Sequence, residues 1–165
     1  MRWICALCGG VWAGAAAAAP VDADAARRAL DRRAMAVLGA QGVLSVGVGV
    51  PLALGASDPG ARAAGGMTAA WGAINGGIAG LGAVGSRQPA ADPVAAAAKT
   101  RRVLAVNIGL DALYVGAGAW MAARGTATGD PRLHGAGAAI VAQGGFLWAF
   151  DVGYLVAHRR LARGG

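Results

Sequence analysis

The chain has 165 residues, of which 56% are hydrophobic and 14% are charged, and its mean hydropathy is +0.51. Ordinary soluble domains are less apolar than this, so the composition indicates a membrane protein. A net charge of +7 would suit nucleic-acid binding, but the arginines flank apolar segments and do not form a basic face interleaved with aromatic residues. We therefore predict no nucleic-acid partner.

Residues 1–19 have the layout of a secretory signal peptide. Arg2 precedes an apolar run, and the small-residue stretch 13–19 is typical of a cleavage region. We favour cleavage near Ala18, and the alternative is an uncleaved N-terminal hydrophobic helix. Cys5 and Cys8 lie in this segment without a second cysteine pair or a nearby histidine, so we assign them no redox or metal role.

Residues 20–165 are predicted to form a single all-α domain. Segment 21–33 carries Asp and Arg at one-turn spacing, which favours a solvated helical collar that belongs to no site. Four apolar segments follow, each about 20 residues long, which is enough to cross the ~30 Å hydrocarbon core of a bilayer. They cover residues 34–56, 63–85, 103–122 and 135–157. We expect these spans to form a membrane-embedded four-helix bundle.

The spans contain a weak internal repeat. The first aligns with the third at an offset of 69 residues, which pairs the arginines at 32–33 with those at 101–102. The second aligns with the fourth at an offset of 68, which pairs the amide-Gly-Gly unit at 75–77 with that at 143–145. These offsets favour a duplicated helical hairpin, a known way to build membrane proteins. Chance similarity is the alternative, because glycine and alanine matches are frequent in this composition.

Glycines recur every fourth residue in the second span, at Gly72, Gly76 and Gly80. This spacing places them on one helix face, where small residues allow another helix to approach closely. We predict that this face is a packing seam and that Gly76→Leu disrupts the protein. The same face is a candidate contact for a second copy or another membrane partner.

Polar side chains occur in all four spans at similar depth, given a rise of about 1.5 Å per residue. Ionisable groups in a lipid-facing segment are costly, so they normally face the bundle interior and find partners there. We expect the following residues to meet as one intramembrane cluster: Gln41, Asn75, Asn107, Asp111, Tyr114, Gln143, Asp151 and Tyr154.

Three functions compete for this cluster. The first is a structural or partner-binding role, in which polar groups hold the helices together. The second is a small transporter or ligand-binding membrane protein that uses Asp111 and Asp151. The third is a membrane-embedded enzyme, although we assign no catalytic residue because no nucleophile triad or phosphate loop is present. We predict no cofactor and no metal site, since Asp151 and His158 lie two turns apart, roughly 10 Å along a helix.

Four sequence patterns resemble those of a known family. They are Arg28-x-Leu30 to Gly39, Met67-x-x-x-Trp71-x-x-x-Asn75, Asn107-x-Gly109-Leu110-Asp111-x-x-Tyr114, and Arg132-Leu133-x-Gly135 to Phe150-Asp151. Together they resemble an uncharacterised family of small bacterial four-helix membrane proteins, a domain of unknown function. The first span departs from that family, which usually has a tryptophan near Gln41 and an asparagine near Ser45. The resemblance implies membrane residence and no assigned activity.

The orientation in the membrane depends on two conflicting signals. Beyond Arg2, one end of the bundle carries eleven basic residues and the other three. We call the first the basic end, and its residues are Arg27, Arg28, Arg32, Arg33, Arg87, Lys99, Arg101, Arg102, Arg159, Arg160 and Arg163. The positive-inside rule places this end in the cytoplasm, whereas a cleaved leader places it outside. We favour the cleaved leader and expect a multi-pass protein of the bacterial cytoplasmic (inner) membrane.

Overall fold

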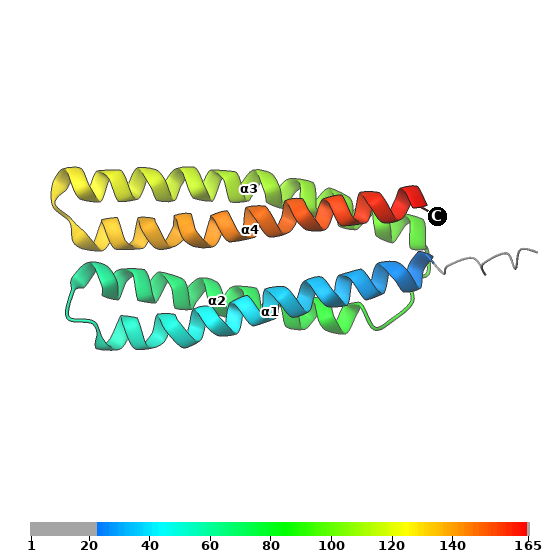
Figure 1. The fold of residues 1–165 in the computed structure, drawn as a ribbon, viewed down its shortest axis with the longest axis horizontal. Coiled ribbons are helices and arrows are strands. Elements are labelled where there is room, and N and C mark those ends of the chain that lie inside the picture. Colours follow the sequence, from blue (N-terminus) through cyan, green and yellow to red (C-terminus); the bar gives the residue numbers. More distant parts are fainter. Residues whose placement is uncertain (1–22, 165) are drawn as a thin grey trace, which may run out of the picture.

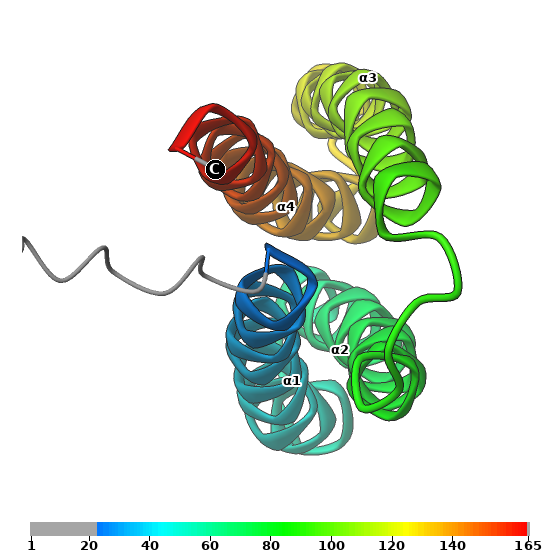
Figure 2. The same ribbon diagram turned by 90° about the vertical axis from the view of Figure 1, so that its right-hand side faces the viewer.

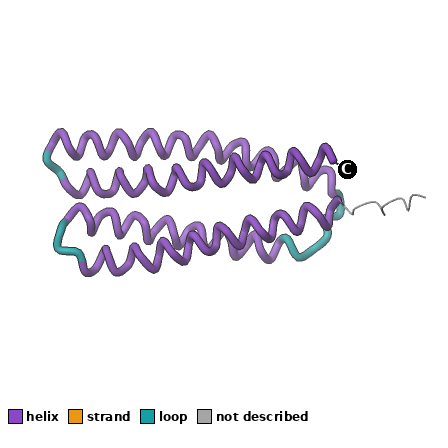
Figure 3. Tube along the Cα trace, in the orientation of Figure 1, coloured by secondary structure: helices purple, strands orange, loops and turns teal. Residues whose placement is uncertain are grey.

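The computed structural model describes residues 23–164, and it contains four helices joined by short connections at the two ends of a long bundle (Figures 1 and 3). The helices are α1 (Ala23–Gly55), α2 (Pro59–Gly85), α3 (Pro93–Thr128) and α4 (Pro131–Gly164). This confirms the predicted all-α fold with four helices. Each predicted span lies within one helix, except that the first extends one residue beyond the end of α1. The predicted leader, with Cys5 and Cys8, lies outside the described residues.

The last three helices begin in the same way, with an aspartate followed by a proline. The aspartate caps the helix, and proline suits the first helical position because its missing N–H would have no partner there. Asp58 accepts a hydrogen bond from the backbone N–H of Ala61 at 2.6 Å, and Asp92 accepts one from that of Ala95 at 2.9 Å. Asp130 accepts one from the backbone N–H of Leu133 at 3.1 Å. These caps set where α2, α3 and α4 start.

The helices pack as two hairpins, α1 with α2 and α3 with α4 (Figure 1). The hairpins meet mainly through α2 and α4, whereas α1 touches α4 less and α3 least. Figure 2 shows this arrangement from the basic end, with α4 between α3 and the α1–α2 hairpin. The contact between α1 and α4 therefore depends on a small number of residues.

Glycines allow the helices of each hairpin to approach closely. A Cβ atom added at Gly49 of α1 would lie 2.5 Å from the backbone nitrogen of Ala69 and 2.7 Å from the carbonyl oxygen of Gly65 on α2. In the second hairpin, a Cβ atom at Gly118 would lie 2.9 Å from the carbonyl oxygen of Gly137. Backbone atoms occupy the space that a side chain would need, so these crossings require glycine.

The predicted glycine seam on α2 is only partly correct. Gly72 is buried, and a Cβ atom there would lie 2.6 Å from the Cβ atom of Ser45. The backbone of Gly76 lies against Gly42, but Cβ atoms at Gly76 and at Gly80 would meet nothing within 4 Å. The closest approach of α1 and α2 therefore runs along the helix face that contains Gly65 and Gly72, because the helices cross and diverge toward the basic end.

Three helices of the described chain, α1, α3 and α4, are long and apolar enough to cross a membrane. This indicates a membrane protein. The helix α2 is also long enough, but no segment of it reaches the hydropathy of a membrane span, because glycines and Asn75 interrupt its apolar residues. The hydropathy of the helices thus supports the first, third and fourth predicted spans as membrane spans, but not the second.

Candidate functional site

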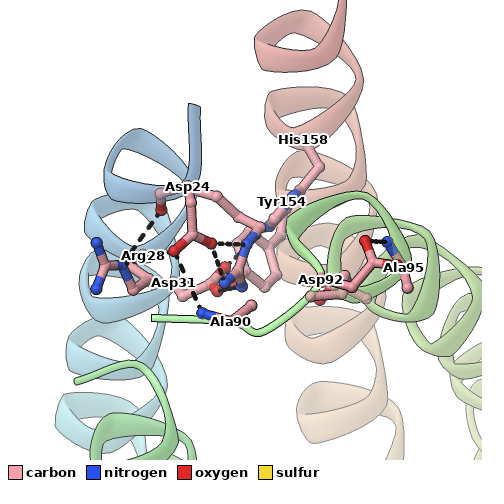
Figure 4. Close-up of polar contacts among 11 residues, drawn as sticks. Asp24, Arg28, Asp31, Ala90, Asp92, Ala95, Tyr154 and His158 are labelled. Carbon is pink, nitrogen blue, oxygen red and sulfur yellow. Dashed lines mark hydrogen bonds and ion pairs between the residues drawn. The ribbon is translucent and has the colours of Figure 1, made fainter. Parts of the chain in front are cut away.

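The polar residues expected in one cluster separate into groups along the bundle. An amide group in the middle contains Gln41, Ser45, Asn75 and Gln143. An acid pair, Asp111 and Asp151, lies with Asn107 nearer the basic end. An ionic network at the basic end contains Asp24, Arg27, Arg28, Asp31, Tyr154 and His158 (Figure 4). The separation follows from the helix rise, because side chains two turns apart cannot converge.

The amide group joins α1, α2 and α4. The Gln41 amide nitrogen donates to Gln143 at 2.5 Å and to Ser45 at 2.9 Å, and Asn75 donates to Gln41 at 2.9 Å. Gln143 also donates to the Ser45 hydroxyl at 3.2 Å. Asn75 is the largest fully buried side chain among the described residues. The group is closed on itself, since its members supply one another's partners.

The acid pair is buried between α3 and α4. The carboxyl groups of Asp111 and Asp151 interact with each other, and the Asn107 side chain interacts with Asp151. Neither carboxyl forms an ion pair with a described Lys, Arg or His residue. The Oδ2 atom of Asp111 is the one buried side-chain oxygen or nitrogen of the described chain that lacks a hydrogen-bond partner. Two facing carboxyls require a shared proton or a cation between them.

The ionic network connects α1 with α4 at the basic end (Figure 4). The Asp31 carboxylate accepts a hydrogen bond from the Tyr154 hydroxyl, pairs with the His158 ring at 3.1 Å, and accepts a hydrogen bond from Arg27 at 2.7 Å. Asp24 pairs with Arg27 at 2.7 Å and accepts a hydrogen bond from the backbone N–H of Ala90 at 3.3 Å. The network thus holds the first turns of α1 against α4 and the α2–α3 connection.

Asp31 lies before the apolar segment 34–56, in the charged part of α1. Burial raises the pKa of this carboxyl, but the hydrogen bonds from His158 and Tyr154 and the attraction of Arg27 outweigh burial, so that its pKa is lowered overall. A carboxyl whose pKa is lowered on folding stabilises the folded state at pH values above its unfolded-state pKa, which is about 3.9 for Asp. This stabilisation is lost as the pH falls through the folded-state pKa. The Asp31 carboxylate therefore makes its full contribution to stability at neutral pH.

The sequence prediction for segment 21–33 is wrong in one respect. Its described part, residues 23–33, is helical as expected, but Asp24 is buried and Asp31 is the centre of an interhelical network. Position along the helix axis indicates this contact, because Asp31 and Tyr154 each lie within about one turn of the basic end of their apolar segments.

Two tyrosines also lie away from the expected positions. Tyr154 points to Asp31 and not to Asp151, so it belongs to the ionic network. Tyr114 is 41% exposed, and its ring packs edge-on against Trp71 with centroids 5.2 Å apart. The sequence predicted Tyr114 near the acid pair because it shares a helix face with Asp111. The spacing of three residues, however, separates the two side chains by about 4.5 Å along the helix axis.

A crevice of about 340 Å³ lies between the acid pair and the ionic network, and residues of all four helices line it. Its volume falls in the range of small-ligand sites, which begin at about 300 Å³. Apolar walls include Leu38 of α1, Ile78 of α2, Leu104 of α3 and Phe150 of α4. The charged and amide side chains along it are Arg27, Asp31, Lys99, Asn107 and Asp151. Arg27 is neutralised by Asp24 and Asp31, which leaves the acid pair as the uncompensated buried charge.

The fold and the site define a class of protein: a four-helix bundle with a polar interior and an apolar surface, in which three helices are long and apolar enough to cross a membrane. The chain matches a family described as a family of unknown function (DUF6992) over residues 37–152, and it belongs to that family. The matched range begins after the charged part of α1 and ends directly after Asp151, so it includes the amide group and the acid pair. No curated protein and no solved structure matches the chain.

Proposed function

We propose that the chain is a multi-pass membrane protein of the bacterial inner membrane that binds a small organic cation at the acid pair. The distribution of side chains supports membrane residence. Large apolar residues point outward, with Leu54 and Leu81 both 79% exposed and Val43 72% exposed. The fully buried side chain of Asn75 lies inside. Such a distribution is unfavourable in water and favourable in lipid, which cannot satisfy polar groups.

Membrane residence is tested by reporters at opposite ends of the bundle. One alkaline phosphatase fusion follows Gly165 and the other follows Ser57, which lies in the α1–α2 turn at the opposite end. Because a spanning bundle separates these ends, exactly one fusion is expected to be active. We expect the fusion after Gly165 to be active, as a cleaved leader requires. If only the fusion after Ser57 is active, the orientation is the opposite of the one proposed. Equal activity of both fusions contradicts a spanning protein.

The observation that carries the ligand proposal is the uncompensated acid pair at the crevice. Asp151 lines the crevice, and Asp111 lies behind it with an unpartnered oxygen. A cation that entered would take the place of the shared proton and compensate one of the two negative charges. The apolar walls favour a cation with a hydrocarbon portion over a fully hydrated ion.

Alkylammonium ions serve as the probe for this site. We expect a short-chain alkylammonium to stabilise the purified protein against thermal unfolding, and the alcohol of the same chain length to have less effect. Asp151→Asn is expected to weaken the ammonium effect by about tenfold or more, since a hydrogen bond to a charged group contributes about 1.5–3 kcal/mol. The effect should also weaken as the pH is lowered, because protons compete for the same carboxyls.

The matched control is Asp92→Asn. This change removes one charge but retains the helix cap, because asparagine caps as well as aspartate. The control is expected to respond to alkylammonium like the unmodified protein. Equal responses of Asp151→Asn and Asp92→Asn would contradict a cation site at the acid pair.

The amide group supports a second, structural role. Gln41, Asn75 and Gln143 satisfy one another and connect three helices, so nothing in this group is left to recognise a ligand. This is the arrangement by which polar side chains specify helix pairing in membranes. A duplicated hairpin is supported by corresponding crossings: Gly49 against Ala69 and Gly118 against Gly137 are related by the offsets of 69 and 68.

A further inference from the structure

A second concave surface lies on the outer side of the α1–α2 hairpin, away from the acid pair. It is a groove of about 430 Å³ that is lined by residues of these two helices and by Arg87, which follows the end of α2. Gly39, Gly76 and Gly80 line its length, and Arg32 and Arg87 lie at its basic end. Its lining contains no carboxylate.

Helix packing does not explain the two glycines of α2 in this groove. Cβ atoms at Gly76 and Gly80 would meet nothing within 4 Å, so neither position needs glycine to fit against α1. Glycine inside a helix is less favourable than alanine by about 0.5–1 kcal/mol. The missing side chains leave open space, and that space makes the groove.

The two arginines are exposed, and within the described part of the chain neither side chain forms an ion pair. Arg32 belongs to α1 and Arg87 to the α2–α3 connection, and both line the same groove. Arg32 lies just before the apolar segment of α1, and Arg87 follows the end of α2. In a bilayer this places both guanidinium groups at the level of the lipid headgroups, where arginine pairs with phosphate.

The length of the groove matches one leaflet. From Arg32 to Val43 the groove follows α1 for eleven residues, roughly 16 Å at the helical rise. One leaflet of the hydrocarbon core is about 15 Å thick. We infer that the groove binds an anionic phospholipid, with its phosphate between Arg32 and Arg87 and one acyl chain along the glycines. This inference depends on the membrane residence proposed above, but not on the cation site.

A second copy of the chain fits the same groove less well. A symmetric contact brings the same surface of both copies together, so Arg32 and Arg87 would face their own counterparts. Like charges at such a contact are unfavourable, and no carboxylate of the groove compensates them. An anionic lipid, by contrast, supplies the opposite charge and the hydrocarbon.

The test is a titration of phosphatidylglycerol, and of phosphatidylcholine with the same acyl chains, into the full chain in detergent, followed by native mass spectrometry. We expect tight binding of one phosphatidylglycerol and weak binding of phosphatidylcholine. The double variant Arg32→Gln with Arg87→Gln should bind phosphatidylglycerol roughly 30-fold more weakly, given the usual contribution of each basic residue near a lipid surface. The control, Arg33→Gln with Arg102→Gln, removes the same charge outside the groove and should bind normally.

Gly80→Leu tests the acyl-chain part of the site, because it fills the groove and retains both arginines. We expect it to lose the tight phosphatidylglycerol as well. If the double variant and its control bind phosphatidylglycerol equally, the inference is overturned, because the lipid would then respond only to the net charge of the protein. A detergent-solubilised dimer that Gly80→Leu converts to monomer, without lipid binding, would assign the groove to a second copy instead. Failure of membrane residence is distinguishable, because the chain would then be recovered without detergent.

Discussion

Gly49→Leu is expected to prevent the α1–α2 hairpin from packing. A Cβ atom at this position would lie 2.5 Å from the backbone nitrogen of Ala69 and 2.9 Å from its Cα atom. Backbone atoms cannot rotate away as a side chain can, so the helices must separate. Overpacking costs typically 1–3 kcal/mol, and we expect about 3 kcal/mol or more here, because the colliding atoms belong to a helix backbone. Size-exclusion chromatography in detergent should reveal loss of the monodisperse species.

The control for this experiment is Gly76→Leu. From the sequence, this change was predicted to be disruptive, but the structure leaves open space where its Cβ atom would lie. We therefore expect Gly76→Leu to purify and melt like the unmodified protein, while Gly49→Leu does not. If Gly76→Leu were the damaging change and Gly49→Leu harmless, the crossing of α1 and α2 would differ from the one described.

Asp31→Ala is expected to loosen the basic end of the bundle. The change removes the acceptor of Arg27, Tyr154 and His158, and it leaves a mostly buried histidine and tyrosine without their partner. Removing one member of a buried ionic network destabilises a protein by about 3 kcal/mol. Because α1 touches α4 at few other places, we expect a lower Tm and faster hydrogen exchange in residues 23–33.

Arg33→Ala provides the comparison, since Arg33 is an exposed neighbour on the same helix and forms no ion pair within residues 23–164. It should melt within experimental error of the unmodified protein. Indistinguishable melting of Asp31→Ala and Arg33→Ala would mean that the network contributes nothing to the stability of the bundle.

Features that depend on local sequence can be predicted without the tertiary structure. Apolar segments of spanning length predicted all four helices, since an apolar stretch near 20 residues has few alternatives to a helix in lipid. The ends of the third span were less accurate, because α3 begins ten residues before the predicted span 103–122 and continues six residues beyond it. Charged residues lower hydropathy without lowering helix propensity, so hydropathy alone shortens a helix.

The candidate site depended on contacts between helices. Depth along the axis predicted one cluster, whereas the structure joins Gln41, Asn75 and Gln143 in one group and Asp111 with Asp151 in another. It failed for Tyr114 and for Tyr154, because depth does not determine the rotation of a helix about its own axis or the partner that it faces. That rotation is set by the glycine crossings at Gly49 and Gly118, where backbone atoms of two helices meet. Composition and hydropathy thus specify four long helices, three of them apolar enough to cross a membrane, whereas close packing between them selects which polar groups meet.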